Sequence, residues 1–219
     1  MPALNLASLN LGQWVVIGLS AVMGIWFLAG IVINRRVGRE ACVLVASGFE
    51  GYSSGAPSWL DLATVGMAIK PARHGLPVER MEAVVSLERR ENLPLWLFQR
   101  AAGKRDALAL RVIMAKKPDF EAHLLHAREY ASINALTHER EPALQRRDTV
   151  DGFSLFVGGE PPAPALKVFE DLCARFKDSI VRLSLRPDNP NLLLHVRYPV
   201  EKATVAALAR SIEAIHNQL

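Results

Sequence analysis

Residues 1–33 carry no charged side chain, and three arginines follow almost at once. Within this stretch Trp14–Ile33 is a mainly apolar run of 20 residues. As a helix rising ~1.5 Å per residue, it would be about 30 Å long, the thickness of the hydrocarbon core of a bilayer. We therefore expect a transmembrane helix over residues 14–33, preceded by a short extracytoplasmic segment, residues 1–13.

The flanks of this run predict its orientation. Arg35, Arg36 and Arg39 follow it, whereas no basic residue precedes it. Lysine and arginine are retained on the cytoplasmic side of a membrane. We expect the N-terminus outside the cell, the three arginines at the headgroups of the inner membrane, and the rest of the chain in the cytoplasm. A cleaved signal peptide would have a basic start and a shorter apolar run, so we expect an uncleaved anchor.

Small residues within the run suggest a surface for helix packing. Ser20 and Gly24 are four residues apart, and Gly18 adds to the smooth surface. Such residues let two membrane helices approach closely. We therefore expect a partner helix, either from another membrane protein or from a second copy of this chain. Of the two tryptophans, Trp14 suits the outer interface, whereas Trp26 is expected to face lipid or that partner.

The remaining sequence predicts an α+β domain of mixed sheet and helices. Residues 34–55 read as a juxtamembrane helix and turn, 56–138 as a first α+β half, 139–150 as a polar linker, and 151–219 as a second half with the order β-α-β-β-α. The pattern leaves open whether the halves share one sheet. The predicted strands are Leu62–Lys70, Met81–Arg89, Ala107–Ala115, Phe120–His126 (alternatively the start of a helix), Gly152–Val157, Ile180–Leu185 and Leu192–Tyr198; the predicted helices are Leu93–Ala102, Ala165–Phe176 and Val200–Asn217.

The clearest local signal is a hairpin near the C-terminus. The segment Pro187-Asp188-Asn189-Pro190 is strong turn chemistry between two alternating apolar runs. We expect Ile180–Leu185 and Leu192–Tyr198 to be adjacent antiparallel strands. Arg182, Ser184 and Arg186 should then point to the wetter side of the sheet.

Two patterns could in principle carry chemistry. Ser53 lies in a G-x-S-x-G sequence, but a helix-like segment precedes it and Ala56-Pro57 follows it, so the strand-to-helix context of a nucleophile elbow is missing. His123 and His126 would share a face on a helix but point to opposite faces of a strand. We therefore expect no catalytic residue, metal ligand or cofactor, and we keep an enzyme acting near the membrane as the alternative.

Two charged clusters, Arg89-Arg90-Glu91 and Lys104-Arg105-Asp106, flank the predicted helix Leu93–Ala102. Basic residues interleaved with Trp96 and Phe98 are a pattern that can bind nucleic acid. No nucleic-acid-binding motif accompanies them. We expect internal ion pairs and a basic surface facing the membrane, and nucleic acid is not an expected partner.

These same clusters, with Pro94-Leu95-Trp96-Leu97 between them, carry a resemblance. The sequence resembles uncharacterised prokaryotic single-pass membrane proteins that have a cytoplasmic α+β domain. The resemblance implies an anchor followed by such a domain, and it implies no activity or site residues. The sequence thus favours an anchored protein that acts by contacts, as an accessory or scaffolding subunit of a membrane assembly.

Overall fold

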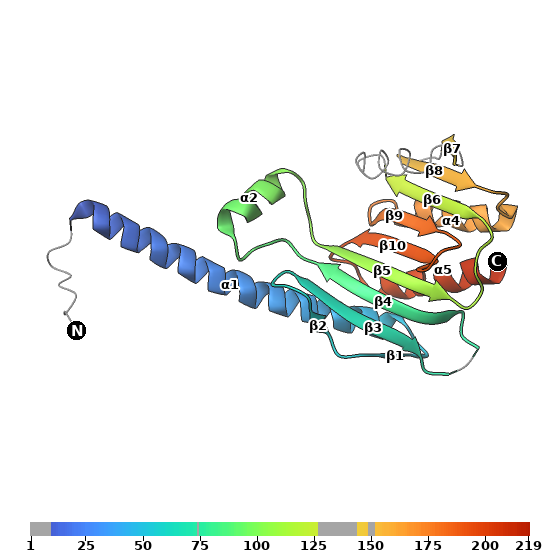
Figure 1. Cartoon of the computed structure of the whole chain (residues 1–219), viewed down its shortest axis with the longest axis horizontal. Coiled ribbons are helices and arrows are strands. Elements are labelled where there is room, and N and C mark those ends of the chain that lie inside the picture. The colour runs from blue at the N-terminus through green and yellow to red at the C-terminus, as the bar shows by residue number, and fades with distance from the viewer. Residues whose placement is uncertain (1–9, 74, 127–143, 149–151) are drawn as a thin grey trace.

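The computed structural model describes residues 10–73, 75–126, 144–148 and 152–219. A single helix of 38 residues, α1 (Leu11–Gly48), runs from the N-terminal side into a sheet domain (Figure 1). Asn10 caps it: its side chain accepts a hydrogen bond from the amide of Gln13, whose side chain accepts one from the amide of Asn10. α1 is long and apolar enough to cross a membrane.

Within the described residues the domain is built on one antiparallel sheet of ten strands. Their order across the sheet is β1-β3-β4-β5-β10-β9-β6-β8-β7, with β2 paired to β3. The strands are β1 (Tyr52–Ser54), β2 (Ser58–Trp59), β3 (Thr64–Pro71), β4 (Val78–Ser86), β5 (Ala107–Met114), β6 (Glu121–His126), β7 (Gln145–Asp148), β8 (Phe153–Gly158), β9 (Ile180–Leu185) and β10 (Leu192–Arg197).

Helices cover one face of this sheet. The C-terminal part of α1 lies over β3 and β4, next to α5 (Lys202–Gln218), which in turn packs against α4 (Ala163–Phe176) (Figure 1). Alternate residues of each strand face this layer. In β5, for example, Leu108, Leu110 and Val112 are fully buried, as their spacing predicts. α2 (Leu93–Ala101) is the exception: it lies between β4 and β5 in the chain but outside the helical layer.

The sheet differs from the sequence prediction in two respects and answers one question that the sequence left open. Every strand pairing among the described residues is antiparallel, so the sheet is not mixed. Both predicted halves share it, because β10 pairs with β5 and β6 pairs with β9. Part of the predicted linker forms the edge strand β7, whose polar residues suit an edge. Two parts of the predictions lie outside the described residues. They are residues 139–143 and 149–150 of the predicted linker and residues 1–9 of the predicted N-terminal segment.

The predicted hairpin is confirmed. β9 and β10 are adjacent and antiparallel, with Leu194 opposite Leu183, and both side chains are buried. The prediction for Ser184 was wrong. Its side chain is buried rather than wet, and its hydroxyl accepts a hydrogen bond from Nε of Arg182 at 2.8 Å. Ser184 also lies opposite His123 of β6, so it is a central position of a wide sheet rather than the edge of an isolated hairpin.

Candidate functional site: the junction between the helix and the sheet domain

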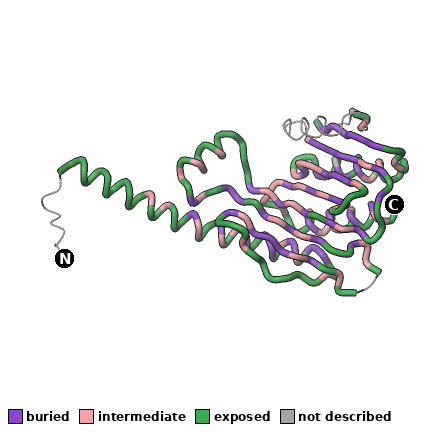
Figure 2. The backbone as a smooth tube through the Cα atoms, viewed as in Figure 1, coloured by how far each residue is buried: buried purple, intermediate pink, exposed green. Residues whose placement is uncertain are grey.

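Burial divides α1 into two parts. From Leu11 to Ala29 the large apolar side chains are mostly exposed, whereas from Gly30 onward one stripe of the helix is buried (Figure 2). The buried positions recur every three or four residues, as expected for one face of a helix. They are Gly30, Asn34, Gly38, Ala41, Cys42, Val45 and Gly48.

Three glycines in this stripe let the domain approach the helix axis. A Cβ atom on Gly30 would lie 2.5 Å from the carbonyl carbon of Arg90. One on Gly38 would lie 2.6 Å from the ring of Trp59, and one on Gly48 would lie 2.5 Å from Val205. These distances are shorter than any ordinary carbon–carbon contact. The helix is thus seated in the domain along its whole C-terminal part, with no room for side chains at these positions.

Asn34 is the polar centre of this contact and is fully buried. Its amide nitrogen donates to the carbonyl oxygen of Glu88 at 3.2 Å and to the carboxylate of Glu91 at 3.1 Å. Its side-chain oxygen accepts a hydrogen bond from the guanidinium of Arg90 at 3.0 Å. One side chain of the helix therefore joins three residues that follow β4. Because buried polar groups are costly when unpaired, these bonds specify the depth and rotation of α1.

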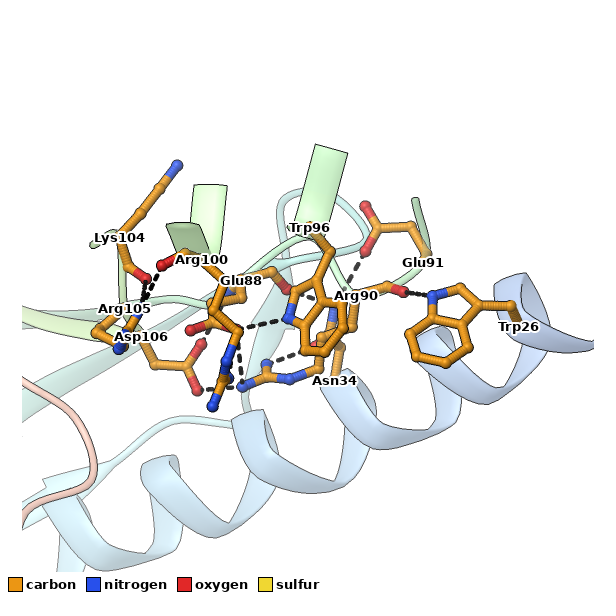
Figure 3. A network of polar contacts seen from close by, with 10 residues as sticks. All are labelled: Trp26, Asn34, Glu88, Arg90, Glu91, Trp96, Arg100, Lys104, Arg105 and Asp106. Atoms are coloured by element: carbon orange, nitrogen blue, oxygen red, sulfur yellow. Dashed lines mark hydrogen bonds and ion pairs between the residues drawn. The ribbon is translucent and has the colours of Figure 1, made fainter. Parts of the chain in front are cut away.

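A second set of contacts holds those residues to the rest of the domain (Figure 3). Arg90 forms an ion pair with Asp106 at 2.7 Å, and Asp106 also accepts a hydrogen bond from the amide of Glu88 at 2.6 Å. The buried carboxylate of Glu88 accepts from the indole of Trp96 at 2.6 Å and from Arg100 at 3.4 Å. The segments on both sides of α2 and α2 itself are therefore linked to α1 through one continuous polar network.

Trp26 marks the N-terminal limit of this junction. Its indole nitrogen donates to the carbonyl oxygen of Arg90 at 2.7 Å, and its ring lies 5.5 Å from that of Trp96 (Figure 3). The expectation that Trp26 faces lipid or a partner helix was therefore wrong. The sequence showed a tryptophan deep in an apolar run, and it did not show that the domain folds back along the helix to meet it.

The residues predicted to pack against a partner helix remain open to one. Gly18, Ser20 and Gly24 are exposed, and a Cβ atom on Gly18 or Gly24 would meet nothing within 4 Å. Gly24 also lines a groove of about 710 Å³ between α1 and α2, together with Phe27 and Leu95 and with Met23, Leu62, Arg89, Glu91, Asn92 and Pro94.

The three arginines predicted at the lipid headgroups lie on α1 beside the domain. The guanidinium of Arg35 stacks over the ring of Trp59 at 4.1 Å. Arg36 forms an exposed ion pair with Glu40 at 2.8 Å, and Arg39 is exposed. Arg35 thus makes a contact within the protein, Arg36 is paired at the surface, and Arg39 is exposed.

The residues considered for catalysis do not converge. Ser53 lies on the edge strand β1, where its hydroxyl donates to the carbonyl of Lys70 at 3.4 Å. His123 and His126 lie on β6, several strands away across the sheet, and Nε2 of His123 is 2.7 Å from Glu121. β6 is a strand, as favoured from the sequence, so the two histidines point to opposite faces. No group of three metal-ligating side chains occurs among the residues described.

The face of the sheet away from the helices carries a basic group. His195 of β10 lies opposite Arg182 of β9, and Arg111 of β5 also acts on it. Burial and the two arginines lower the pKa of His195. The pKa of Arg182 is lowered as well, by burial and by Arg186. Burial and the neighbouring arginines thus disfavour the charged form of this histidine.

No protein-family model matches this chain, and no curated protein matches it. The junction must therefore be interpreted from its own geometry. One signal for this junction is visible in the sequence, namely the two mixed-charge clusters that flank α2. The partners of those charges could not be foreseen, because Asn34 and Trp26 lie more than fifty residues earlier in the chain.

Proposed function

We propose that this chain is a single-pass protein of the inner membrane, with its N-terminus outside and its sheet domain in the cytoplasm. We propose further that it acts by protein contacts, as an accessory or scaffolding subunit of a membrane assembly. The observation that carries this proposal is the division of α1. One uninterrupted helix has an exposed apolar part and a part that is buried in the domain and locked by the network around Asn34.

The exposed apolar part of α1, from Leu11 to Ala29, is unfavourable in water and favourable in a bilayer. Because the same helix continues into the domain, the domain would be carried at a fixed distance from the membrane. A rigid mounting suits a protein that presents a surface to neighbouring subunits. The arginines that follow the apolar part support the cytoplasmic placement of the domain.

The orientation is tested with protease. Trypsin added to intact cells should spare the chain after Arg39, and trypsin added to inverted membrane vesicles should digest it. Digestion from outside the cell would contradict the proposed orientation.

The partner is tested by purification in a mild detergent followed by identification of the proteins that accompany the chain, a second copy included. Gly24→Leu should release the partner and leave the chain in the membrane, because the side chain blocks close helix packing. Ile25→Leu is the matched control, since Ile25 is exposed and leucine has the same volume. Retention of the partner by Gly24→Leu would show that packing at Gly24 does not hold it. Absence of any partner from the unmodified chain would overturn the scaffold proposal.

A further inference from the structure

The packing of the fold does not explain why α2 is apolar. This helix is rich in large apolar residues, yet none of its residues is buried. Leu97 is 53% exposed and Phe98 is 72% exposed. A helix of nine residues is too short to be stable by itself in water, so contacts must hold it in place. Those contacts fix one side of α2 and leave the apolar side free.

The anchoring of α2 is specific. The side chain of Asn92 accepts a hydrogen bond from the amide of Leu95 at 3.1 Å and caps the helix, and Pro94 stands in its first turn. The indole of Trp96 is bound to the buried carboxylate of Glu88. Trp96 therefore faces the junction, and Leu97 and Phe98, the next residues along the helix, are turned away from it.

A second exposed apolar element lies near α2. Leu60 and Leu62, in the connection between β2 and β3, are both exposed. Leu62 and Leu95 line the same groove as Met23 and Phe27 of α1. This groove places α2 and the β2–β3 connection beside the exposed apolar part of α1. α2 lies at the end of the domain nearest to that part of α1 (Figure 1).

Around this surface, acidic and basic side chains differ in their burial. The acidic groups next to α2, Glu88, Glu91 and Asp106, are buried and paired within the junction. The basic side chains that remain exposed near it are Arg89, Arg100, Lys104 and Arg105. The exposed carboxylate of Asp61 is paired with Arg89 at 3.3 Å. Arg100 is paired with the buried carboxylate of Glu88 at 3.4 Å. Lys104 and Arg105 are thus exposed basic side chains beside the apolar surface that form no ion pair with the described residues.

We propose that α2 and the β2–β3 connection form an interfacial element that lies in the headgroup region of an anionic bilayer. Phe98 and Leu97 enter the acyl boundary, and Lys104 and Arg105 contact lipid phosphates. An apolar face bordered by lysine and arginine is the pattern of helices that lie in a membrane interface. This inference rests on the proposed function, because it requires α1 to span the same membrane.

The first experiment uses an environment-sensitive nitrobenzoxadiazole label on single cysteines, in a background in which Cys42 and Cys173 are alanine. The full chain is placed in nanodiscs of phosphatidylcholine and phosphatidylglycerol. The label is attached at Phe98→Cys, at Val22→Cys in the exposed part of α1, and at Asp188→Cys in the β9–β10 turn. We expect lipids with a doxyl quencher on the acyl chain to quench the label at positions 98 and 22, and iodide in the buffer to quench it at 188.

Each alternative result has a distinct meaning. Quenching by doxyl lipid at position 22 and by iodide at 98 would overturn the interfacial element and leave the membrane anchor intact. Failure of doxyl lipid to quench at 22 would overturn the proposed anchoring, and this inference with it. A label at 98 that is shielded from both quenchers would show that protein rather than lipid covers α2, which also overturns the inference.

The second experiment uses the unmodified chain and does not depend on how the cysteine variants fold. Trypsin cleavage after Lys104 and Arg105 is compared between detergent and the same nanodiscs, with the bond after Lys116 in the exposed β5–β6 connection as the control site. We expect cleavage in nanodiscs to slow at Lys104 and Arg105 but not at the control site. The slowing should be smaller when phosphatidylcholine is the only lipid. Equal rates in detergent and in nanodiscs at Lys104 and Arg105 would contradict the proposal.

Discussion

Replacing Asn34 with leucine measures how strongly the junction holds α1 on the sheet. The side chain makes one hydrogen bond to a peptide carbonyl and one each to the charged groups of Glu91 and Arg90. Such bonds contribute about 1 kcal/mol between neutral groups and about 1.5–3 kcal/mol with a charged partner. Their sum is roughly 4–7 kcal/mol. Arg90 keeps its ion pair with Asp106, and leucine gains apolar burial. We therefore expect a net loss of about 3 kcal/mol.

Cys42 provides the assay. It lies on the same buried stripe of α1 and is only 1% exposed, so a maleimide reaches its thiol when α1 separates from the sheet. Burial also raises the pKa of this thiol, which keeps it protonated and unreactive in the closed state. In a Cys173→Ala background the labelling rate then follows the opening equilibrium. A loss of about 3 kcal/mol should accelerate labelling by roughly a hundredfold.

Val43→Ala in the same background is the matched control, because Val43 is exposed on the same helix. Its effect on the free energy of opening should stay within about 0.5 kcal/mol. If Asn34→Leu labels as slowly as the control, the polar network does not hold α1, and the argument from buried hydrogen bonds fails.

Three further changes test other parts of the same reasoning. Gly30→Ala should lower the midpoint of thermal unfolding in detergent, because its Cβ would meet the backbone of the domain, whereas Gly24→Ala has open space and should not lower it. Trp96→Phe leaves the buried carboxylate of Glu88 without its shortest hydrogen bond and should reduce the free energy of unfolding in urea by about 1–3 kcal/mol. Since burial and neighbouring arginines lower the pKa of His195, the unfolded chain takes up that proton first. Stability should thus fall as the pH drops below the unfolded value of about 6.5, and His195→Gln should weaken that dependence of the urea midpoint.

Local patterns in the sequence predict much of this fold. The alternation in Ala107–Met114 and the turn before Leu192 depend on neighbours in the chain, and both strands form as expected. The helix after Arg35 also continues to Gly48, where glycine and serine residues follow. The short strands β1 and β2 were not predicted, because two or three residues carry no periodic signal.

The junction could not be predicted in the same way. A glycine in an apolar helix reads equally well as a contact with another membrane helix or with the chain's own domain. Gly30 turned out to meet Arg90, while Gly24 faces open space. To decide which of the two contacts a glycine makes, one must know the position of a segment about sixty residues away. The same applies to Asn34, which reads as an isolated polar residue until its partners are placed beside it.

The absence of any break in α1 between its exposed and buried parts has a mechanical consequence. At ~1.5 Å per residue the helix is a rod of about 57 Å, and the domain is fixed by buried contacts to its C-terminal half, from Gly30 to Gly48. Any tilt of the rod is therefore passed to the sheet as the same rotation. In a thicker or thinner bilayer, where a membrane helix adjusts its tilt, the far edge of the sheet would swing through an arc while the attachment point stayed in place. The chain would convert membrane thickness into the height and direction at which its distal surface is presented.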